Sequence, residues 1–217
     1  DTGHSSTSIS AGLGIVTANQ IKGDDSTVVS VIGDGAMTGG LAFEALNNAA
    51  SINRNFIMIL NDNEMSIAQN VGGLSSYLSG IRTGETYNDL KDGVVKSLSN
   101  IPVVGDKLVK HIRKTKSSIK QLVIPGMLFE NMDITYLGPI DGHNIDELES
   151  LLEKAKYFDE PVLIHVLTKK GKGYSFAEED KLGTWHGIGK FNKETGEVEI
   201  SKKENYVSWS QLISNGL

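Results

Sequence analysis

Cysteine is absent from all 217 residues, which excludes disulfides, thiolate metal sites and a cysteine nucleophile. Together with the lack of a signal-peptide pattern, this favours an intracellular, cytoplasmic protein. No apolar run approaches the roughly 20 residues of a membrane span. Basic residues are also in deficit, because 21 Lys and Arg face 27 Asp and Glu for a net charge of −6. We therefore expect no general attraction to nucleic acid and no membrane partner.

The stretch from Val28 to Met65 carries the strongest pattern in the chain. It reads VVSVIGDGAMTGG, then LAFEALNNAASINRN, then FIMILNDNEM. An apolar β-branched run, a glycine turn, a helical pattern and a second apolar run predict a strand, loop, helix, strand unit. We expect the strands at Val28–Ile32 and Phe56–Leu60, and the helix at Thr38–Ser51 with Thr38 as its N-cap.

Asp34 is the residue in this stretch that needs a chemical explanation. Its neighbours Gly33 and Gly35 would let backbone N–H groups approach a phosphate, which the carboxylate of Asp34 would repel. A divalent cation between them removes the conflict, since Mg²⁺ is held by one or two protein oxygens plus substrate phosphates. Asn61, Asp62 and Asn63 supply further oxygens at the end of the next strand, where open parallel sheets bind ligands. The unit is therefore interpreted as a metal–diphosphate site.

Two simpler interpretations compete for GDGAMTGG. A dinucleotide fingerprint would place its third glycine at position 38, which is Thr38, and would leave Asp34 beside an unshielded pyrophosphate. Gly-Asp-Gly is also a common turn, but a turn alone does not explain the oxygen-rich strand end that follows one helix later. The metal–diphosphate hypothesis accounts for both halves.

The rest of the chain alternates helical and strand patterns. A helix of small residues is expected at Ser5–Gln20, strands at Ile134–Leu137 and Val162–Leu167, and a helix between them that begins with the Asn144–Glu147 capping pattern. This alternation predicts a doubly wound, mostly parallel α/β sheet with helices on both faces. Residues 66–121 interrupt the alternation with Gly- and Ser-rich sequence and a basic segment, which makes them a lid candidate.

The histidines and serines give weaker signals. His4 lies beside four hydroxyl residues, which fits either a helix start or a functional loop, and no G-x-S-x-G motif supports serine hydrolase chemistry. His186 follows Trp185 and precedes a glycine-rich run, so it is the better candidate for proton transfer. His143 is expected in a turn, His165 inside a strand and His111 on the surface.

Several blocks together resemble one enzyme family. Gly33-Asp34-Gly35 followed by Asn61-Asp62-Asn63 resembles the thiamine diphosphate motif of transketolase-like enzymes. In chain order, GHSSTSISAGLG, GDGAMTGGLAFEALN, ILNDNEMSIAQNVG, YLGPIDGHN, TKKGKGY and HGIGKF are similar to the 1-deoxy-D-xylulose-5-phosphate synthase family. The resemblance covers Asp1 to about Phe191. It implies the thiamine diphosphate-binding fold and a transferase that joins pyruvate, after decarboxylation, to glyceraldehyde 3-phosphate for isoprenoid, thiamine and pyridoxal biosynthesis.

The resemblance also implies roles for individual residues. Asp34, the Asn63 side chain and the Met65 carbonyl would hold Mg²⁺. Gly35 and Ala36, next to Gly33, would contact the diphosphate of thiamine diphosphate through their backbone. The remaining implied residues are Gly3, His4 and Ser5 along the cofactor, Tyr174 closing over it, and His186 taking part in proton transfers at the substrates.

The resemblance also implies a domain organisation. Residues 1–191 would form the diphosphate-binding domain with 66–121 as a lid-like insertion, and 192–217 a linker and the start of a pyrimidine-binding domain. The chain begins without Met, already inside what looks like a functional loop, so a fragment is expected. By the resemblance, the glutamate that activates the cofactor lies in the pyrimidine-binding domain, so no turnover is expected from this chain by itself. Intact family members are homodimers. The alternatives are a subunit of a split transketolase and a non-catalytic thiamine diphosphate-binding module.

Overall fold

The computed structural model describes residues 4–65, 70–83, 127–180, 182–198, 207 and 209–216. The chain divides into two compact units, Asp1–Lys170 and Gly171–Leu217. The first unit holds the sheet and the candidate metal site. Each unit is described by itself.

A four-stranded parallel sheet forms the centre of the first unit. Its strands are β1 (Val29–Gly33), β2 (Phe56–Asp62), β3 (Thr135–Asp141) and β4 (Pro161–Leu167), in the order β1-β2-β4-β3. β2 and β4 are apolar on both faces, as strands covered by helices on each side require. The four strands expected from the apolar runs are thus confirmed, and so is the parallel α/β class.

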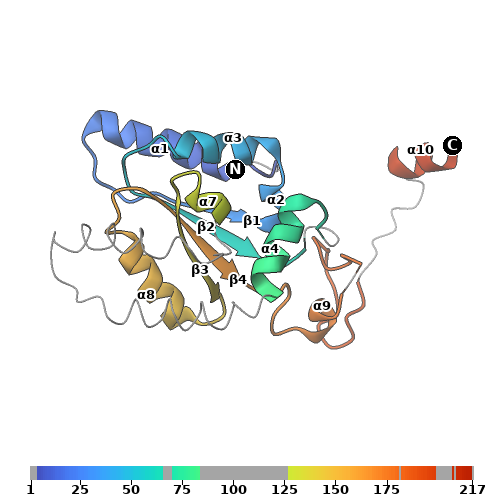
Figure 1. Ribbon diagram of the computed structural model, residues 1–217. Helices are drawn as coiled ribbons and strands as arrows, with labels where there is room; N and C mark the ends of the chain where they lie inside the picture. Colours follow the sequence, from blue (N-terminus) through green and yellow to red (C-terminus); the bar gives the residue numbers. More distant parts are fainter. Residues whose placement is uncertain are drawn as a thin grey trace. The chain divides into compact units, whose positions relative to one another are not determined.

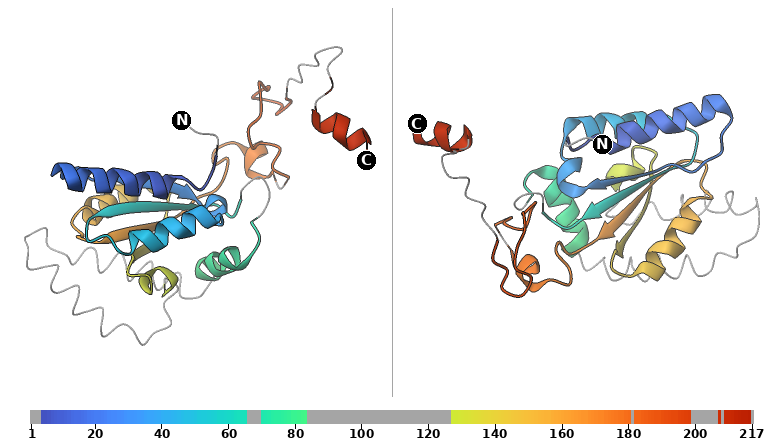
Figure 2. Two further views of the ribbon diagram at one scale, coloured as in Figure 1. Left: turned by 90° about the horizontal axis from the view of Figure 1, so that it is seen from above. Right: turned by 180° about the vertical axis from the view of Figure 1, so that it is seen from behind.

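Helices cover both faces of this sheet (Figure 1). On one face, α1 (Ser8–Lys22) and α3 (Gly40–Ala49) lie side by side, as Figure 2 shows from above. The short helices α2 (Asp34–Met37) and α7 (Met127–Glu130) and the longer α4 (Gly73–Thr83) share the apolar core of that face. On the other face, α8 (Ile145–Ala155) packs over β3 and β4. The doubly wound arrangement predicted from the sequence is confirmed.

β2 contributes to both cores because successive side chains of a strand point to opposite faces. Phe56, Met58 and Leu60 enter the core beneath α1 and α3, whereas Ile57 and Ile59 face α8. Asp62, at the carboxyl end, continues the first set. The site described below therefore lies on the face covered by α1, α3 and α4.

The predicted helix starts were correct at one position and wrong at another. Asn144 caps α8, because its side-chain oxygen accepts from the backbone N–H of Glu147 at 3.3 Å. Thr38 does not cap α3, which begins at Gly40 after Gly39. Instead, the Thr38 hydroxyl donates to the Gly35 carbonyl at 2.7 Å and closes the separate turn α2. A local hydroxyl-to-carbonyl bond thus competed successfully with the N-cap.

β3 is longer than the sequence suggests. It runs through Gly138 and Pro139 to Asp141, beyond the end at Leu137 expected from the sequence. A shift of register between Leu137 and Ile140 accommodates the proline, and among the described strands β3 lies at an edge of the sheet, where a missing N–H is tolerated. His143 lies in the following turn, as expected, and its Nε2 accepts from the backbone N–H of Lys169 at 2.9 Å.

Part of the predicted lid lies outside the described residues. Within 66–121, the structure describes only 70–83, which carry α4. The basic segment around His111 falls in the range that is not described, so the lid hypothesis stays a prediction.

The second unit contains α9 (Ser175–Glu178) and α10 (Trp209–Gly216). Phe191 forms an antiparallel bridge with Val198.

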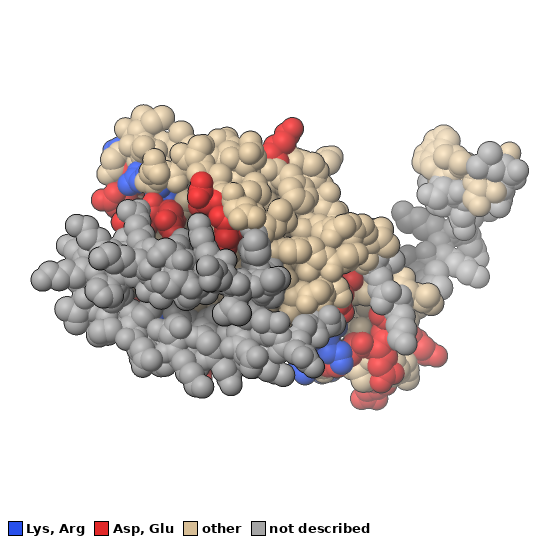
Figure 3. All heavy atoms as spheres, in the orientation of Figure 1, with Lys and Arg blue, Asp and Glu red and all other residues tan. Residues whose placement is uncertain are grey.

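Among all described residues, no helix is both long and apolar enough to cross a membrane. On the face drawn in Figure 3, acidic side chains cover more of the described surface than basic ones do.

Candidate functional site

Asp34 lies where β1 ends and α2 begins, at the carboxyl end of the sheet. β1 continues to Gly33, and the first turn of α2 starts at Asp34 itself. The backbone N–H groups of a first helical turn have no partner inside the helix and can face a ligand. Since α2 has only four residues, these N–H groups matter more than any helix dipole. The predicted position of Asp34 at a strand-to-helix junction is confirmed.

The carboxylate of Asp34 is buried next to that of Asp62. Burial, followed by the interaction with Asp62, raises the pKa of Asp34 to about 6. For Asp62, burial opposes ionisation, but hydrogen bonds from His165 and Arg82 outweigh it and hold the pKa of Asp62 well below its usual range. The pair therefore carries negative charge at neutral pH in a place where water is scarce, and a cation would relieve it.

A hollow of about 200 Å³ lies at these carboxylates. Its lining consists of Asp34, Asp62, Glu64, Asn70, Ser75, Leu78 and Ser79. The Asn70 side-chain amide donates to Asp34 Oδ2 at 2.8 Å. No group of three His, Cys, Asp or Glu side chains among the described residues is arranged as a metal site by itself. A site here would thus combine carboxylate oxygens with amide and carbonyl oxygens, the hard donors that Mg²⁺ prefers.

The three polar residues at the end of β2 do not form one cluster. Asn61 accepts from the Thr168 hydroxyl at 2.7 Å, Asp62 turns into the hollow, and Asn63 Oδ1 accepts from the Met65 N–H at 3.0 Å. Glu64, between the two predicted metal donors Asn63 and Met65, has a left-handed backbone with φ of 63°. Such strain in a residue other than glycine is typical of functional sites.

The opening loop is fixed against α2 on the other side of Asp34. Ser6 also has a left-handed backbone, with φ of 68°, and its hydroxyl donates to the Ala36 carbonyl at 2.6 Å. A Cβ on Gly39 would come too close to the Ser6 side chain unless that side chain moved, so this contact favours glycine there. His4 and Ser5 are exposed next to this contact, and Gly3 lies outside the described residues. The structure thus brings the predicted opening loop to the predicted diphosphate turn.

Three residues near the site were not assigned a role by the sequence. Arg82 of α4 pairs with Asp62 and, at 3.0 Å, with Glu64. His165 of β4 contacts Asp62, and Tyr136 of β3 contacts His165. The signal for His165 was present, because a single histidine in the apolar run VLIHVL needs a buried partner. The identity of that partner depends on strand register, which the sequence does not reveal.

Of the two predicted residues of the second unit, Tyr174 lies in an aromatic cluster and His186 lies in an exposed turn. The Tyr174 ring packs against Trp185, Phe176 and Phe191, with centroid separations of 5.0, 5.4 and 5.8 Å, and its hydroxyl donates to the Lys193 carbonyl at 3.1 Å. His186 is exposed in a tight turn in which its N–H donates to the Gly183 carbonyl at 3.0 Å. The roles of Tyr174 and His186 at the cofactor and substrates stay predictions.

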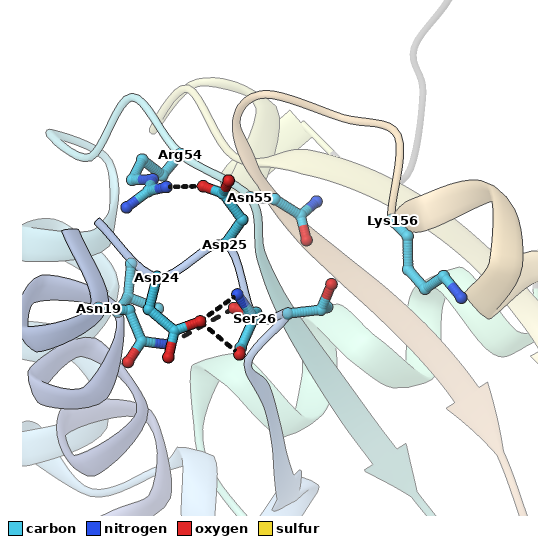
Figure 4. Close-up of a pocket in the computed structure, with 9 residues that line it drawn as sticks. Asn19, Asp24, Asp25, Ser26, Arg54, Asn55 and Lys156 are labelled. Carbon is cyan, nitrogen blue, oxygen red and sulfur yellow. Dashed lines mark hydrogen bonds and ion pairs between the residues drawn. The ribbon is translucent and has the colours of Figure 1, made fainter. Parts of the chain in front are cut away.

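A second hollow of about 100 Å³ lies at the amino ends of the strands (Figure 4). Its charged side chains are engaged by protein groups: Arg54 pairs with Asp25 at 2.9 Å, Asp24 accepts from Ser26, and Lys156 pairs with Glu153 at 2.8 Å. The Asn55 amide donates to the Ala155 carbonyl at 2.7 Å. Ligands of open parallel sheets bind at the carboxyl ends instead, which favours the hollow at Asp34 as the functional site.

A sequence profile of the 1-deoxy-D-xylulose-5-phosphate synthase family matches residues 1–168. The chain belongs to this family. The match includes every predicted metal and diphosphate residue in the first unit.

Curated members of the 1-deoxy-D-xylulose-5-phosphate synthase family are similar along nearly the whole chain. The proteins of that name from Carboxydothermus hydrogenoformans and Caldanaerobacter subterraneus are 56% and 54% identical over 99% and 94% of this chain. The one from Clostridium tetani is 50% identical over the full chain. A transketolase from Campylobacter jejuni superposes on 78% of this chain, and 20% of its own, with a TM-score of 0.47 and 20% identity. The chain spans about a third of the length of these curated relatives.

Proposed function

We propose that this chain forms the diphosphate-binding portion of a 1-deoxy-D-xylulose-5-phosphate synthase. The whole enzyme would join pyruvate, after decarboxylation, to glyceraldehyde 3-phosphate with thiamine diphosphate and Mg²⁺. Its product would feed isoprenoid, thiamine and pyridoxal biosynthesis in the cytoplasm, and the intact enzyme would be a homodimer. In this proposal, residues 1–191 are the diphosphate-binding domain and 192–217 lead into a pyrimidine-binding domain.

One observation carries the cofactor part of the proposal: a buried carboxylate pair, Asp34 and Asp62, at the carboxyl ends of the neighbouring parallel strands β1 and β2. Arg82 already balances the charge of Asp62, whereas burial and the neighbouring Asp62 still raise the pKa of Asp34, so a cation beside Asp34 would favour its ionised form. Mg²⁺ bound to Asp34, to the Asn63 side chain and to the Met65 carbonyl would supply that charge. The diphosphate would then meet the metal on one side and the backbone of Gly33, Gly35 and Ala36 on the other.

The remaining roles concern the reactive end of the cofactor. Thiamine diphosphate supplies the electron sink that decarboxylation of pyruvate requires. Gly3, His4 and Ser5 would line the cofactor, with His4 near enough to move a proton. Tyr174 would close over the bound cofactor, and His186 would exchange protons with the substrates.

Calorimetric titration of the 217-residue chain with thiamine diphosphate, with and without Mg²⁺, tests this proposal. We expect binding that depends on Mg²⁺ and falls at least tenfold in an Asp34→Ala variant, because a lost metal ligand removes the bridge to the diphosphate. Asp25→Asn, at an exposed carboxylate by the other hollow, is the matched control and should bind as the parent does. Binding that ignores Mg²⁺, or that survives Asp34→Ala unchanged, would contradict the metal assignment.

A further inference from the structure

Among the described residues of the first unit, His165 is the most deeply buried titratable side chain that the proposed function does not use. It lies in the middle of β4 with 0% of its surface exposed, between apolar neighbours. A buried imidazole is costly unless both ring nitrogens find partners. Both do: Nδ1 lies 2.7 Å from the Tyr136 hydroxyl and Nε2 lies 2.9 Å from Asp62 Oδ2.

The partners define which ring nitrogen carries the proton. Asp62 also accepts from the Arg82 guanidinium and from the Glu64 N–H, so its carboxylate is surrounded by donors and acts as an acceptor. Nε2 of His165 must therefore donate to Asp62. Nδ1 can then accept from the Tyr136 hydroxyl, so a ring with its proton on Nε2 satisfies both contacts.

Asp62 connects His165 to the predicted metal donors through the carboxylate oxygen that His165 does not contact. Its Oδ1 accepts from the Glu64 N–H at 3.2 Å, and Glu64 is the strained residue between Asn63 and Met65. The Asn63 side chain closes the same turn through the Met65 N–H at 3.0 Å. His165 holds Oδ2, while Arg82 and the Glu64 N–H both donate to Oδ1. Together these contacts fix the carboxylate plane of Asp62, and His165 is the contact that fixes its Oδ2 edge.

We propose that His165 is a positioning residue of the metal–diphosphate site, which orients Asp62 and, through Asp62, the backbone turn that presents Asn63 and Met65. Tyr136 contributes to the same positioning, because its hydroxyl bonds Nδ1 of His165 and so favours the tautomer with the proton on Nε2. The inference rests on the proposed function, since it concerns the geometry of the metal donors. It assigns a role in cofactor binding to two residues of β3 and β4 that lie behind the site.

A purely structural role of His165 would give a different result. Loss of a satisfied buried hydrogen bond lowers stability but leaves the metal affinity of the folded molecules unchanged. A positioning role changes that affinity, because outer partners of metal-site residues typically contribute 10- to 100-fold. Metal affinity and stability must therefore be measured separately on the same variants.

The decisive comparison is His165→Leu against His165→Gln. Leu has no donor for Asp62, whereas the Gln side-chain amide can donate to Asp62 from nearly the position of Nε2. The probe is Mn²⁺ in the presence of thiamine diphosphate, with bound metal followed by electron paramagnetic resonance at a temperature where each variant is folded. We expect about a tenfold or greater loss of Mn²⁺ affinity in His165→Leu and recovery to within about threefold in His165→Gln.

Thr135→Val is the matched control. Thr135 is a buried side chain of β3 whose hydroxyl pairs with Glu160 at the amino end of the sheet. It should lose stability and keep its Mn²⁺ affinity. Equal Mn²⁺ affinity in parent and His165→Leu, both folded, would overturn the proposal. So would a loss in Thr135→Val as large as in His165→Leu.

Tyr136→Phe keeps the proposal testable if His165→Leu does not fold. It preserves the ring that stacks on Phe129 and removes only the hydroxyl. We expect a smaller loss of Mn²⁺ affinity, together with a change in the ¹⁵N chemical shifts of the His165 ring, which report the tautomer directly. Unchanged shifts and unchanged affinity would refute the inference. If the parent chain binds no Mn²⁺ with thiamine diphosphate, the proposed function fails first, and the ¹⁵N shifts still show whether the Nε2–H tautomer exists.

Discussion

The Asn70 side-chain amide donates to Asp34 Oδ2 at 2.8 Å. Asp34 is also the carboxylate that we propose as a metal ligand. The backbone of Asn70 is held as well, because its N–H donates to the Glu64 carbonyl and its carbonyl accepts from Ser75. A bound cation and this amide would compete for the same carboxylate. Asn70 therefore satisfies one oxygen of the Asp34 carboxylate, and metal binding there would weaken this bond.

Replacing Asn70 should separate stability from metal binding. We expect Asn70→Ala to lower the unfolding free energy of the metal-free chain by about 1–2 kcal/mol, because a hydrogen bond to a charged group is lost. Mn²⁺ affinity should stay the same or tighten, since the competing amide is gone. Urea unfolding in EDTA and Mn²⁺ titration check the two halves. Ser76→Ala, which removes an exposed hydroxyl in the next turn, is the control. A weaker Mn²⁺ affinity would instead make Asn70 a metal ligand.

The raised pKa of Asp34 predicts a pH dependence of stability. Because its pKa is about 6 in the folded chain and close to 3.8 in the unfolded chain, the folded state binds the proton more tightly. Stability from Asp34 is therefore present below pH 4 and is lost as the pH rises through 6. In EDTA, Asp34→Asn should be more stable than the parent by about 1–3 kcal/mol at pH 7.5 and nearly equal to it at pH 4. Urea unfolding at both pH values measures this, and an equal difference at the two would contradict it.

Gly12 and Gly14 of α1 offer a matched pair for testing how α1 packs on the sheet. A Cβ on Gly12 would meet the Ser30 hydroxyl and would lie 2.7 Å from the Phe56 ring, whereas a Cβ on Gly14 would meet nothing within 4 Å. Gly12→Ala should destabilise by about 1–3 kcal/mol through overpacking. Gly14→Ala should stabilise by about 0.5–1 kcal/mol, because alanine favours the helix. Thermal unfolding of both variants decides, and a stable Gly12→Ala variant would mean that α1 can move away from β1.

The aromatic cluster of the second unit predicts an optical signature. Trp185 packs edge-on against Tyr174 and Phe191, while Trp209 is largely exposed. In a Trp209→Phe background, Tyr174→Ala should shift the Trp185 emission to longer wavelength and weaken its near-ultraviolet circular dichroism. Tyr174→Phe, which keeps the ring and loses only the hydroxyl bond to Lys193, should keep both signals. Identical spectra for the Ala variant and the parent would show that the cluster does not form in solution.

Sequence reasoning located the sheet because its cues are local. The apolar runs at β1, β2 and β4 are bounded by glycine or polar turns, and Asn144 and Glu147 form a pair within one helical turn. Thr38 failed as an N-cap because a competing carbonyl, that of Gly35, lies within reach only once α2 has formed. The extent of β3 was missed because its register shift beside Pro139 depends on β4.

In the candidate site, too, residues with local cues could be predicted from the sequence, whereas contacts between distant segments could not. Asp34 could be found because a carboxylate between two glycines is chemically conspicuous, and Asn63 because it follows an apolar run. The contacts of Asp62 with Arg82 and His165 span 20 and 103 residues of sequence. Only the register of β2 and β4, and the docking of α4 onto the sheet, bring these side chains together.

The pairing of Leu60 with His165 places Asp62 and His165 on the same side of the sheet. The chemistry of the site thus depends on whether the number of residues between Phe56 and Asp62 is odd or even. Insertion of one residue before Leu60 would turn Asp62 towards α8 and exchange the two cores along the rest of β2. Insertion of two would restore both faces, but it would shift Asp62 two positions along β4 and away from His165. The apolar cores of this seven-residue strand therefore depend only on the parity of its length, whereas the contact between Asp62 and His165 depends on the exact number of residues.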